Sequence, residues 1–229
     1  MSGANVHPPT VHVIAQATMT ATVTVRVNLA VQHMLAAARF SREVGNLECE
    51  HKSQPFGEFW ESILHVATAC VLTAVASLEA YANELFSDRV KIFPGYSQEL
   101  LHNLWETYEQ KPILAKFEFA LLLLNKPQLD RGAPPYQNIK VLVDLRNALI
   151  HFKPEWENEA DEHQKISAKL VRKIEGSPFL SDRLLFPRRW ACHSCTTWAV
   201  HSAIAFAKEF EKLAGVPLKY AGDPNALKP

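Results

Sequence analysis

An arginine, an asparagine and a histidine lie close together near the end of a predicted helix: Arg146, Asn147 and His151. Histidine exchanges protons near neutral pH, so an imidazole can take the proton of a ribose 2′-hydroxyl or protonate a leaving oxygen. An arginine side chain can hold a phosphate and stabilise the charge of a transition state. The asparagine could orient the imidazole or bind the phosphate. Together these residue types suit the cleavage of RNA.

The helix that carries them must stop at Pro154, because proline lacks an N–H group and crowds the preceding turn. Successive side chains turn by about 100°, which separates an apolar stripe from a polar face. The stripe holds Ile139, Leu142, Leu145, Leu149 and Phe152, and the polar face holds Lys140, Asp144, Asn147 and His151. Arg146 is the exception, since it projects into the apolar arc. About 140° separates it from His151, so one chain does not easily aim both at one point.

An arginine in an apolar arc needs a partner or a function, because an unpaired buried charge is costly. One interpretation is an ion pair with an acid on a neighbouring helix. Glu79 is our candidate for that acid, since an acid in a largely apolar helix also needs a partner. The other interpretation is that this arc meets a substrate phosphate or a second subunit. Two copies facing each other across a symmetric interface could then assemble a composite site.

Hydrophobic spacing predicts a mostly all-α fold, a helical bundle. Predicted helices cover 29–44, 57–89, 98–110, 113–124, the stretch between Pro135 and Pro154, 155–173 and 190–214. Gly45 and Asn46 are expected to end the first helix, Ser97 to cap the third, and Gly215 to end the last. The helix at 57–89 is the longest, and its broad apolar surface belongs at the centre of a bundle.

The chain divides into three predicted parts. Residues 1–28 form an extended, possibly β, segment, because Val and Thr alternate there with a period of two. Residues 29–215 form the bundle, with an insert at about 155–189, and residues 216–229 form a C-terminal tail. The acidic start of the insert is expected to be a solvated helix face.

The composition provides no general attraction to nucleic acid. Lys and Arg total 24, and so do Asp and Glu, so any RNA contact must come from a local basic patch. The candidates for this patch are Lys140, Lys153, Arg188 and Arg189. No apolar run approaches the roughly 18 to 20 residues that span a bilayer, and the first residues do not resemble a secretion signal. With four cysteines, this predicts reduced thiols in a cytoplasmic protein that does not contact a membrane.

No metal and no other cofactor is expected. Cys192 and Cys195 have the spacing of two zinc ligands, but a structural zinc site needs four, and no second pair has a suitable spacing. Small buried thiols are the commoner case. The chain has no glycine-rich phosphate loop and no nucleophile elbow, which disfavours nucleotide triphosphate hydrolysis and serine hydrolase chemistry.

The motif resembles that of the HEPN superfamily, an arginine followed after four to six residues by a histidine, commonly with a polar residue next to the arginine. Arg146, Asn147 and His151 match it with four intervening residues, and residues 76–85 (ASLEAYANEL) are similar to the first long helix of many HEPN proteins. The resemblance covers roughly 57–214. It implies a helical bundle that dimerises through the motif helices, and a metal-independent endoribonuclease that leaves a cyclic phosphate, in antiviral defence or as a regulated toxin.

The resemblance implies that Arg146 and His151 are catalytic and that Asn147 assists them, and Glu79 and Asp144 are our candidates for supporting residues. The partners expected are RNA, a second copy of the chain, and an antitoxin or sensor protein. Two other interpretations stay open. Some HEPN modules are not catalytic and bind a nucleotide, RNA or a partner protein, and a purely structural bundle would explain Arg146 by its pairing with Glu79.

Overall fold

The computed structural model describes residues 26–156, 159, 161–221 and 225–229. Over these residues the fold is all-α, as predicted, and no strand occurs. The helices are α1 (Ala30–Glu50), α2 (Phe59–Ser87), α3 (Arg89–Ile92), α4 (Gln98–Tyr108), α5 (Ile113–Leu123), α6 (Pro134–Ile150), α7 (Asp161–Leu170) and α8 (His193–Ala214). A kinked turn at Leu185–Arg189 precedes α8, and Phe186 within it has an extended backbone (φ −96°, ψ 138°). The predicted extended segment lies almost wholly outside the described residues, and the stretch from 26 to 29 has no regular structure.

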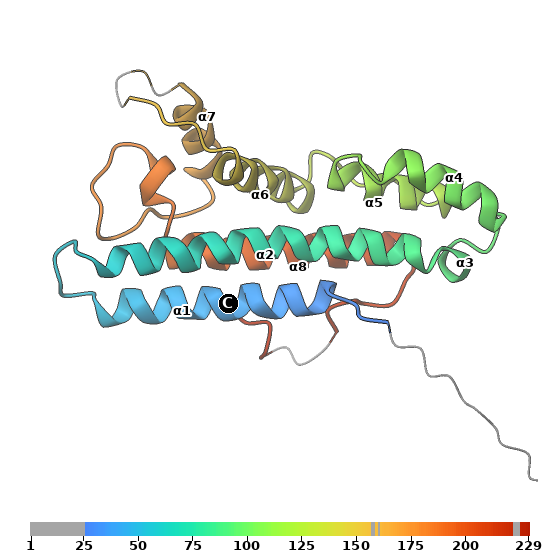
Figure 1. Ribbon diagram of the computed structural model, residues 1–229, viewed down its shortest axis with the longest axis horizontal. Coiled ribbons are helices and arrows are strands. Elements are labelled where there is room, and N and C mark those ends of the chain that lie inside the picture. Colours follow the sequence, from blue (N-terminus) through green and yellow to red (C-terminus); the bar gives the residue numbers. More distant parts are fainter. Residues whose placement is uncertain (1–25, 157–158, 160, 222–224) are drawn as a thin grey trace, which may run out of the picture.

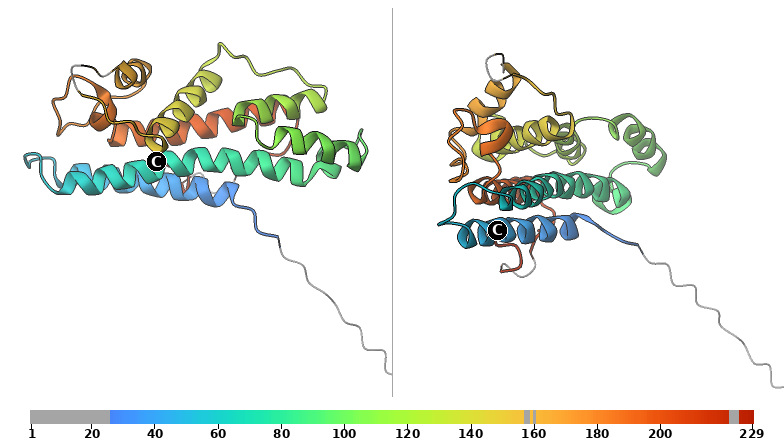
Figure 2. Two further views of the ribbon diagram at one scale, coloured as in Figure 1. Left: turned by 45° about the horizontal axis from the view of Figure 1, so that its top comes forward. Right: turned by 60° about the vertical axis from the view of Figure 1, so that its left-hand side comes forward.

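The helices are arranged in layers (Figures 1 and 2). Long helices α2 and α8 lie side by side, α1 packs against both from one side, and α6 lies on the other side together with the α4–α5 pair. Small side chains let α1 and α2 approach closely, since Ala37 and Ala38 of α1 and Ala67 and Ala74 of α2 are fully buried. Helix α6, which carries the motif, packs against both α2 and α8.

By length and composition α2 could cross a membrane, contrary to the prediction that no segment approaches such a length. In the structure α2 contacts α1, α5, α6 and α8. Its fully buried residues include Val71 and Leu78, as expected for the central helix of a bundle. Among the described helices, α2 alone is long and apolar enough to span a membrane. Because the core helix of a bundle can have the same length and composition, this is weak evidence for a membrane span.

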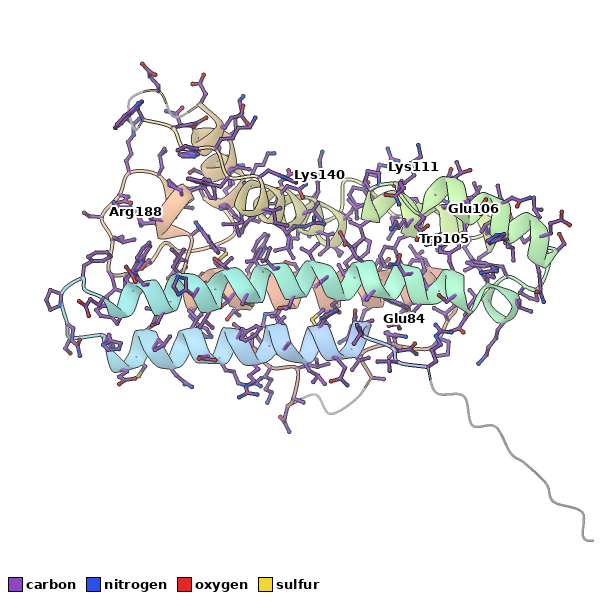
Figure 3. All side chains as sticks on the ribbon, in the orientation of Figure 1. Glu84, Trp105, Glu106, Lys111, Lys140 and Arg188 are labelled. Atoms are coloured by element: carbon purple, nitrogen blue, oxygen red, sulfur yellow. The ribbon has the colours of Figure 1, made fainter. Side chains whose placement is uncertain are left out.

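A buried glutamate fixes the start of α1, where the chain offers no capping side chain of its own. Glu84 of α2 accepts a hydrogen bond of 2.9 Å from the backbone N–H of Ala30 and forms an ion pair with Lys219, which follows α8. Figure 3 shows Glu84 between α2 and the start of α1. In the same view Trp105 joins α4 to α2, its ring stacked on Phe86 at 4.3 Å between centroids. Side chains near the C-terminal end of α2 therefore hold α1 and α4 at the same end of the bundle.

The helix ends were predicted with mixed success. The Ser97 hydroxyl accepts the Leu100 N–H at 3.2 Å, which confirms the predicted cap of α4, and Gly215, with a φ of 71°, ends α8 as predicted. The prediction that Gly45 ends α1 is wrong, because α1 continues to Glu50. A Cβ at Gly45 would lie 3.0 Å from the His193 ring. This glycine therefore permits a close approach of α8 rather than a turn.

Candidate functional site

The motif occupies the C-terminal end of α6. This helix ends at Ile150, and His151 is its C-cap residue, whose N–H donates to the Asn147 carbonyl at 2.9 Å. Asn147 and His151 are both exposed. Their spacing of four puts them on one face, so α6 presents an amide and an imidazole together at its end.

A hollow of about 220 Å³ lies beside this end of α6. Three apolar side chains and a buried histidine line it, namely Ala148, Ile166, Phe186 and His163. The polar side chains around it are Asp144, Asn147, His151, Lys153, Glu162 and Lys169. Four of these six come from the predicted site, and α7 supplies the other two. A concave apolar surface with a few convergent polar groups is the usual form of a small binding site.

Helix α7 holds the turn that follows His151. His163 is 5% exposed; its Nε2 donates to the Lys153 carbonyl at 3.0 Å, and its ring lies 5.6 Å from that of Phe152. Glu155 in turn accepts the His163 N–H at 3.1 Å and the Glu162 N–H at 3.3 Å. Glu155 is therefore only partly exposed and caps the start of α7, whereas the sequence predicted that it belongs to a solvated acidic helix face. These contacts fix the backbone on which His151 and Lys153 stand.

Arg146 lies on another face of α6 and is not among the residues around the hollow. Its guanidinium forms an ion pair with Glu79 of α2, which confirms the predicted pairing. The Arg146 side chain is 21% exposed and that of Glu79 is 42% exposed, so the pair is reachable by solvent. Within one chain the hollow thus collects the histidine and the asparagine of the motif without the arginine.

The other predicted residues do not form one basic patch. Lys140 points outward from α6, whereas Arg188 lies well away from it, after α7 (Figure 3). Arg188 is held by both carboxylate oxygens of Asp182, at 2.8 and 2.7 Å, and Arg189 donates to the Asp182 carbonyl at 2.8 Å. Asp144 pairs with Lys169 at 2.8 Å. Of the four predicted cations, only Lys153 lies at the hollow.

Sequence reasoning missed the residues that α7 contributes to the hollow, among them Lys169 and His163. Both belong to α7, and only the packing of α7 beside α6 brings them near the motif. An ion pair of Lys169 with Asp144 could have been proposed from the sequence, but two opposite charges 25 residues apart form no recognisable motif.

Cys192 and Cys195, the pair with the spacing of two zinc ligands, are free, buried thiols. The Cys192 thiol donates to the Glu175 carbonyl at 3.0 Å, and burial raises its pKa to about 12. Burial also raises the pKa of Cys195, which is fully buried. Both thiols are therefore protonated at neutral pH in the structure described. Over the described parts of the chain, no cluster of three or more His, Cys, Asp or Glu suits a metal ion.

Comparisons with protein families, with curated proteins and with solved structures gave no match to this chain. The site is therefore assessed on its own geometry.

Proposed function

We propose that this chain is an endoribonuclease of the HEPN type that works as a homodimer without a metal. One observation carries the proposal. The hollow collects His151, Asn147 and Lys153, whereas Arg146 stands on a different face of the same helix. A site that needs both arginine and histidine is complete only if a second copy faces the first, which supports a composite site at a symmetric interface.

The proposed reaction needs two proton transfers. The ribose 2′-oxygen attacks the phosphorus and forms a bond to it while the bond to the 5′-oxygen breaks, leaving a 2′,3′-cyclic phosphate. The 2′-hydroxyl must lose its proton and the 5′-oxygen must gain one. The His151 imidazole of one chain can take the proton of the 2′-hydroxyl, and water can give a proton to the departing 5′-oxygen. Arg146 stabilises the charge that develops on the phosphate, and Lys153 and Asn147 position it.

Three side chains of this site are available for such roles. Within the described ranges, no residue forms a hydrogen bond or ion pair with the His151 ring, the Asn147 amide or the Lys153 ammonium. Arg146 must exchange Glu79 for the phosphate, and its partial exposure makes that exchange possible.

Cleavage of RNA by the purified chain, in the presence of a metal chelator, tests the proposal. Arg146→Ala and His151→Ala should each abolish cleavage while helicity and dimerisation persist. Arg172→Ala, which removes an exposed arginine elsewhere, is the matched control and should cleave normally. Cleavage that survives both Arg146→Ala and His151→Ala would remove these residues from the chemistry.

Subunit mixing tests the composite site. If Arg146 and His151 act from opposite chains, exchanging subunits between the two inactive variants should restore roughly a quarter of normal activity, since half of the dimers are mixed and each has one intact site of two. A mixture that stays inactive after exchange would contradict the pairing across chains.

A second candidate function is a non-catalytic module that binds RNA, a nucleotide or a partner protein. The Arg146–Glu79 ion pair favours it, because it occupies the arginine that catalysis would need. Binding of a nucleotide or RNA that is lost in Arg146→Ala, with no cleavage of any RNA, would support this candidate.

A further inference from the structure

The hollow beside His151 has a composition that a phosphate site does not need. Ala148, Ile166 and Phe186 give it an apolar side, and Phe186 is only 2% exposed. A phosphate gains nothing from such contacts, whereas a flat, apolar group does. The space lies directly beside the imidazole that would act on the RNA backbone.

The charges of the hollow also balance. Two lysines, Lys153 and Lys169, are matched by two acids, Asp144 and Glu162. Lys169 Nζ contacts Asp144 Oδ2 at 2.8 Å, and Lys165 Nζ contacts Glu162 Oε1 at 2.6 Å. Phosphate is repelled by carboxylates, so an anion is best held at the edge near Lys153 and not inside the hollow.

One carboxylate that lines the hollow, that of Asp144, can accept a further hydrogen bond. Asp144 Oδ1 has no hydrogen-bond donor among the residues that the structure describes. The Asn147 amide, four residues from His151 on the same helix face, offers both a donor and an acceptor. An apolar surface with a carboxylate oxygen and an amide matches the face and the edge of a nucleobase, since carboxylates accept from amino groups and amides pair with base edges.

We propose that this hollow is a subsite for one unstacked nucleobase with an exocyclic amino group, held next to the phosphate that His151 acts on. The inference rests on the proposed ribonuclease function. The base lies against Ala148 and Ile166, its amino group donates to Asp144 Oδ1, and its phosphate lies near Lys153. Adenine, cytosine and guanine carry such an amino group, and uracil does not.

Calorimetric titration with the 3′-monophosphates of adenosine, cytidine, guanosine and uridine tests the subsite without depending on cleavage. The first three should bind about tenfold or more tightly than the uridine nucleotide, as for one good polar contact to a base. Ala148→Leu should fill the hollow and weaken binding of those three by at least about tenfold. Ala168→Leu makes the same change at an exposed position of α7 outside the hollow, and should bind as the unmodified chain does.

Asp144→Asn serves as a second variant, with little change of shape, in case Ala148→Leu does not fold. It should reduce the preference over the uridine nucleotide to less than about threefold, because an amide oxygen accepts more weakly than a carboxylate and the added NH2 group repels the amino group of the base. Equal binding by the unmodified chain and a folded Ala148→Leu, or an unchanged preference in Asp144→Asn, overturns the subsite.

Cleavage mapping on RNAs that differ in one unpaired base distinguishes an RNA base from a free nucleotide. A preference for cutting next to adenine, cytosine or guanine, lost in Asp144→Asn, supports the subsite as part of a ribonuclease. Nucleotide binding with the expected variant effects but without cleavage supports a nucleobase site, refutes the RNA source and refutes the proposed function. RNA cleavage that shows no base preference, together with no binding of the nucleotides, refutes the subsite but not the proposed ribonuclease function.

Discussion

Replacing Arg146, Glu79 or both by alanine should reveal a coupling of about 1 kcal/mol in the free energy of unfolding. The magnitude follows from exposure. The two side chains are 21% and 42% exposed, so solvent screens the pair more than a buried one. Breaking a fully buried pair costs about 3–5 kcal/mol, whereas exposed pairs contribute about 0–1 kcal/mol. A partly exposed pair should lie at the upper end of the second range.

Urea unfolding of the four chains, followed by circular dichroism, measures this coupling. All chains must be compared at one protein concentration, since the stability of a dimer depends on it. The pair formed by Lys165 and Glu162 provides a matched control, because its side chains are 65% and 62% exposed. A cycle on this control pair should give a smaller coupling, because solvent screens these two charges more strongly.

The size of the coupling decides between two roles for Arg146. A coupling of about 1 kcal/mol is too small to explain a charge in an apolar arc by stability alone. A coupling of about 3 kcal/mol or more, together with unchanged RNA cleavage in Arg146→Ala, would refute this reasoning and make the arginine a structural residue. A coupling no larger than that of the control pair would show that the ion pair contributes nothing measurable.

Three further predictions concern other parts of the structure. His163→Phe keeps a ring beside Phe152 but loses the hydrogen bond to the Lys153 carbonyl; it should cost about 1 kcal/mol in the free energy of unfolding and speed hydrogen exchange in the turn after α6. Burial raises the pKa of Glu211 above 4.5, so the folded chain holds this proton to a higher pH than the unfolded chain. The stability of the unmodified chain relative to Glu211→Gln, measured by urea unfolding, should therefore fall as the pH rises from about 4.5 through the folded pKa; a constant difference would contradict this. The exposed Cys49 should react with a thiol reagent at once, and Cys70, Cys192 and Cys195 only after unfolding, because they are buried; prompt reaction of all four would show that the fold opens.

The sequence predicted features that depend on local rules. The cap at Ser97 and the left-handed end at Gly215 are set by neighbouring residues, so they could be predicted. The pairing of Arg146 with Glu79 is long-range, but it could be predicted because both charges lie on otherwise apolar helix surfaces. In these cases the residue type and its immediate surroundings allow few other structures or partners.

Other features depend on which helices meet. The role of Gly45 depends on the His193 ring of α8, and a glycine in a helix looks like an end unless that neighbour is known. Likewise, Glu155 caps α7 across a turn, and the hollow exists only because α7 lies beside α6. No pattern within α6 or α7 alone specifies the contact between these helices. The sequence therefore predicted Asn147 and His151 of the site but not Lys169 and His163, which lie opposite them on α7.

The strength of the proposed dimer can be bounded from the surface next to the motif. Ile150 and Phe152 are 52% and 49% exposed. Burying the exposed half of each side chain in an interface would contribute about 1 kcal/mol to the free energy of association. Four such side chains in a symmetric pair give about 4 kcal/mol, and association itself costs about 4–15 kcal/mol. The end of α6 alone therefore cannot hold two chains together, and the proposed interface must extend over neighbouring surface. Trp156, which is 80% exposed, is our candidate for that surface.

A weak dimer has a kinetic consequence. Below the dissociation constant, the concentration of dimer rises with the square of the chain concentration, so the cleavage rate should do the same and become linear once the dimer is saturated. Rates measured over a dilution series, with sedimentation to follow assembly, check this. In Trp156→Ala the rate should become linear only at a higher chain concentration, because the substitution removes interface area. The rate at saturation should not change, because Trp156 is no part of the site. A rate that is linear in chain concentration down to fully monomeric protein would show that one chain suffices, and the separation of Arg146 from His151 would then have to be overcome within a single α6.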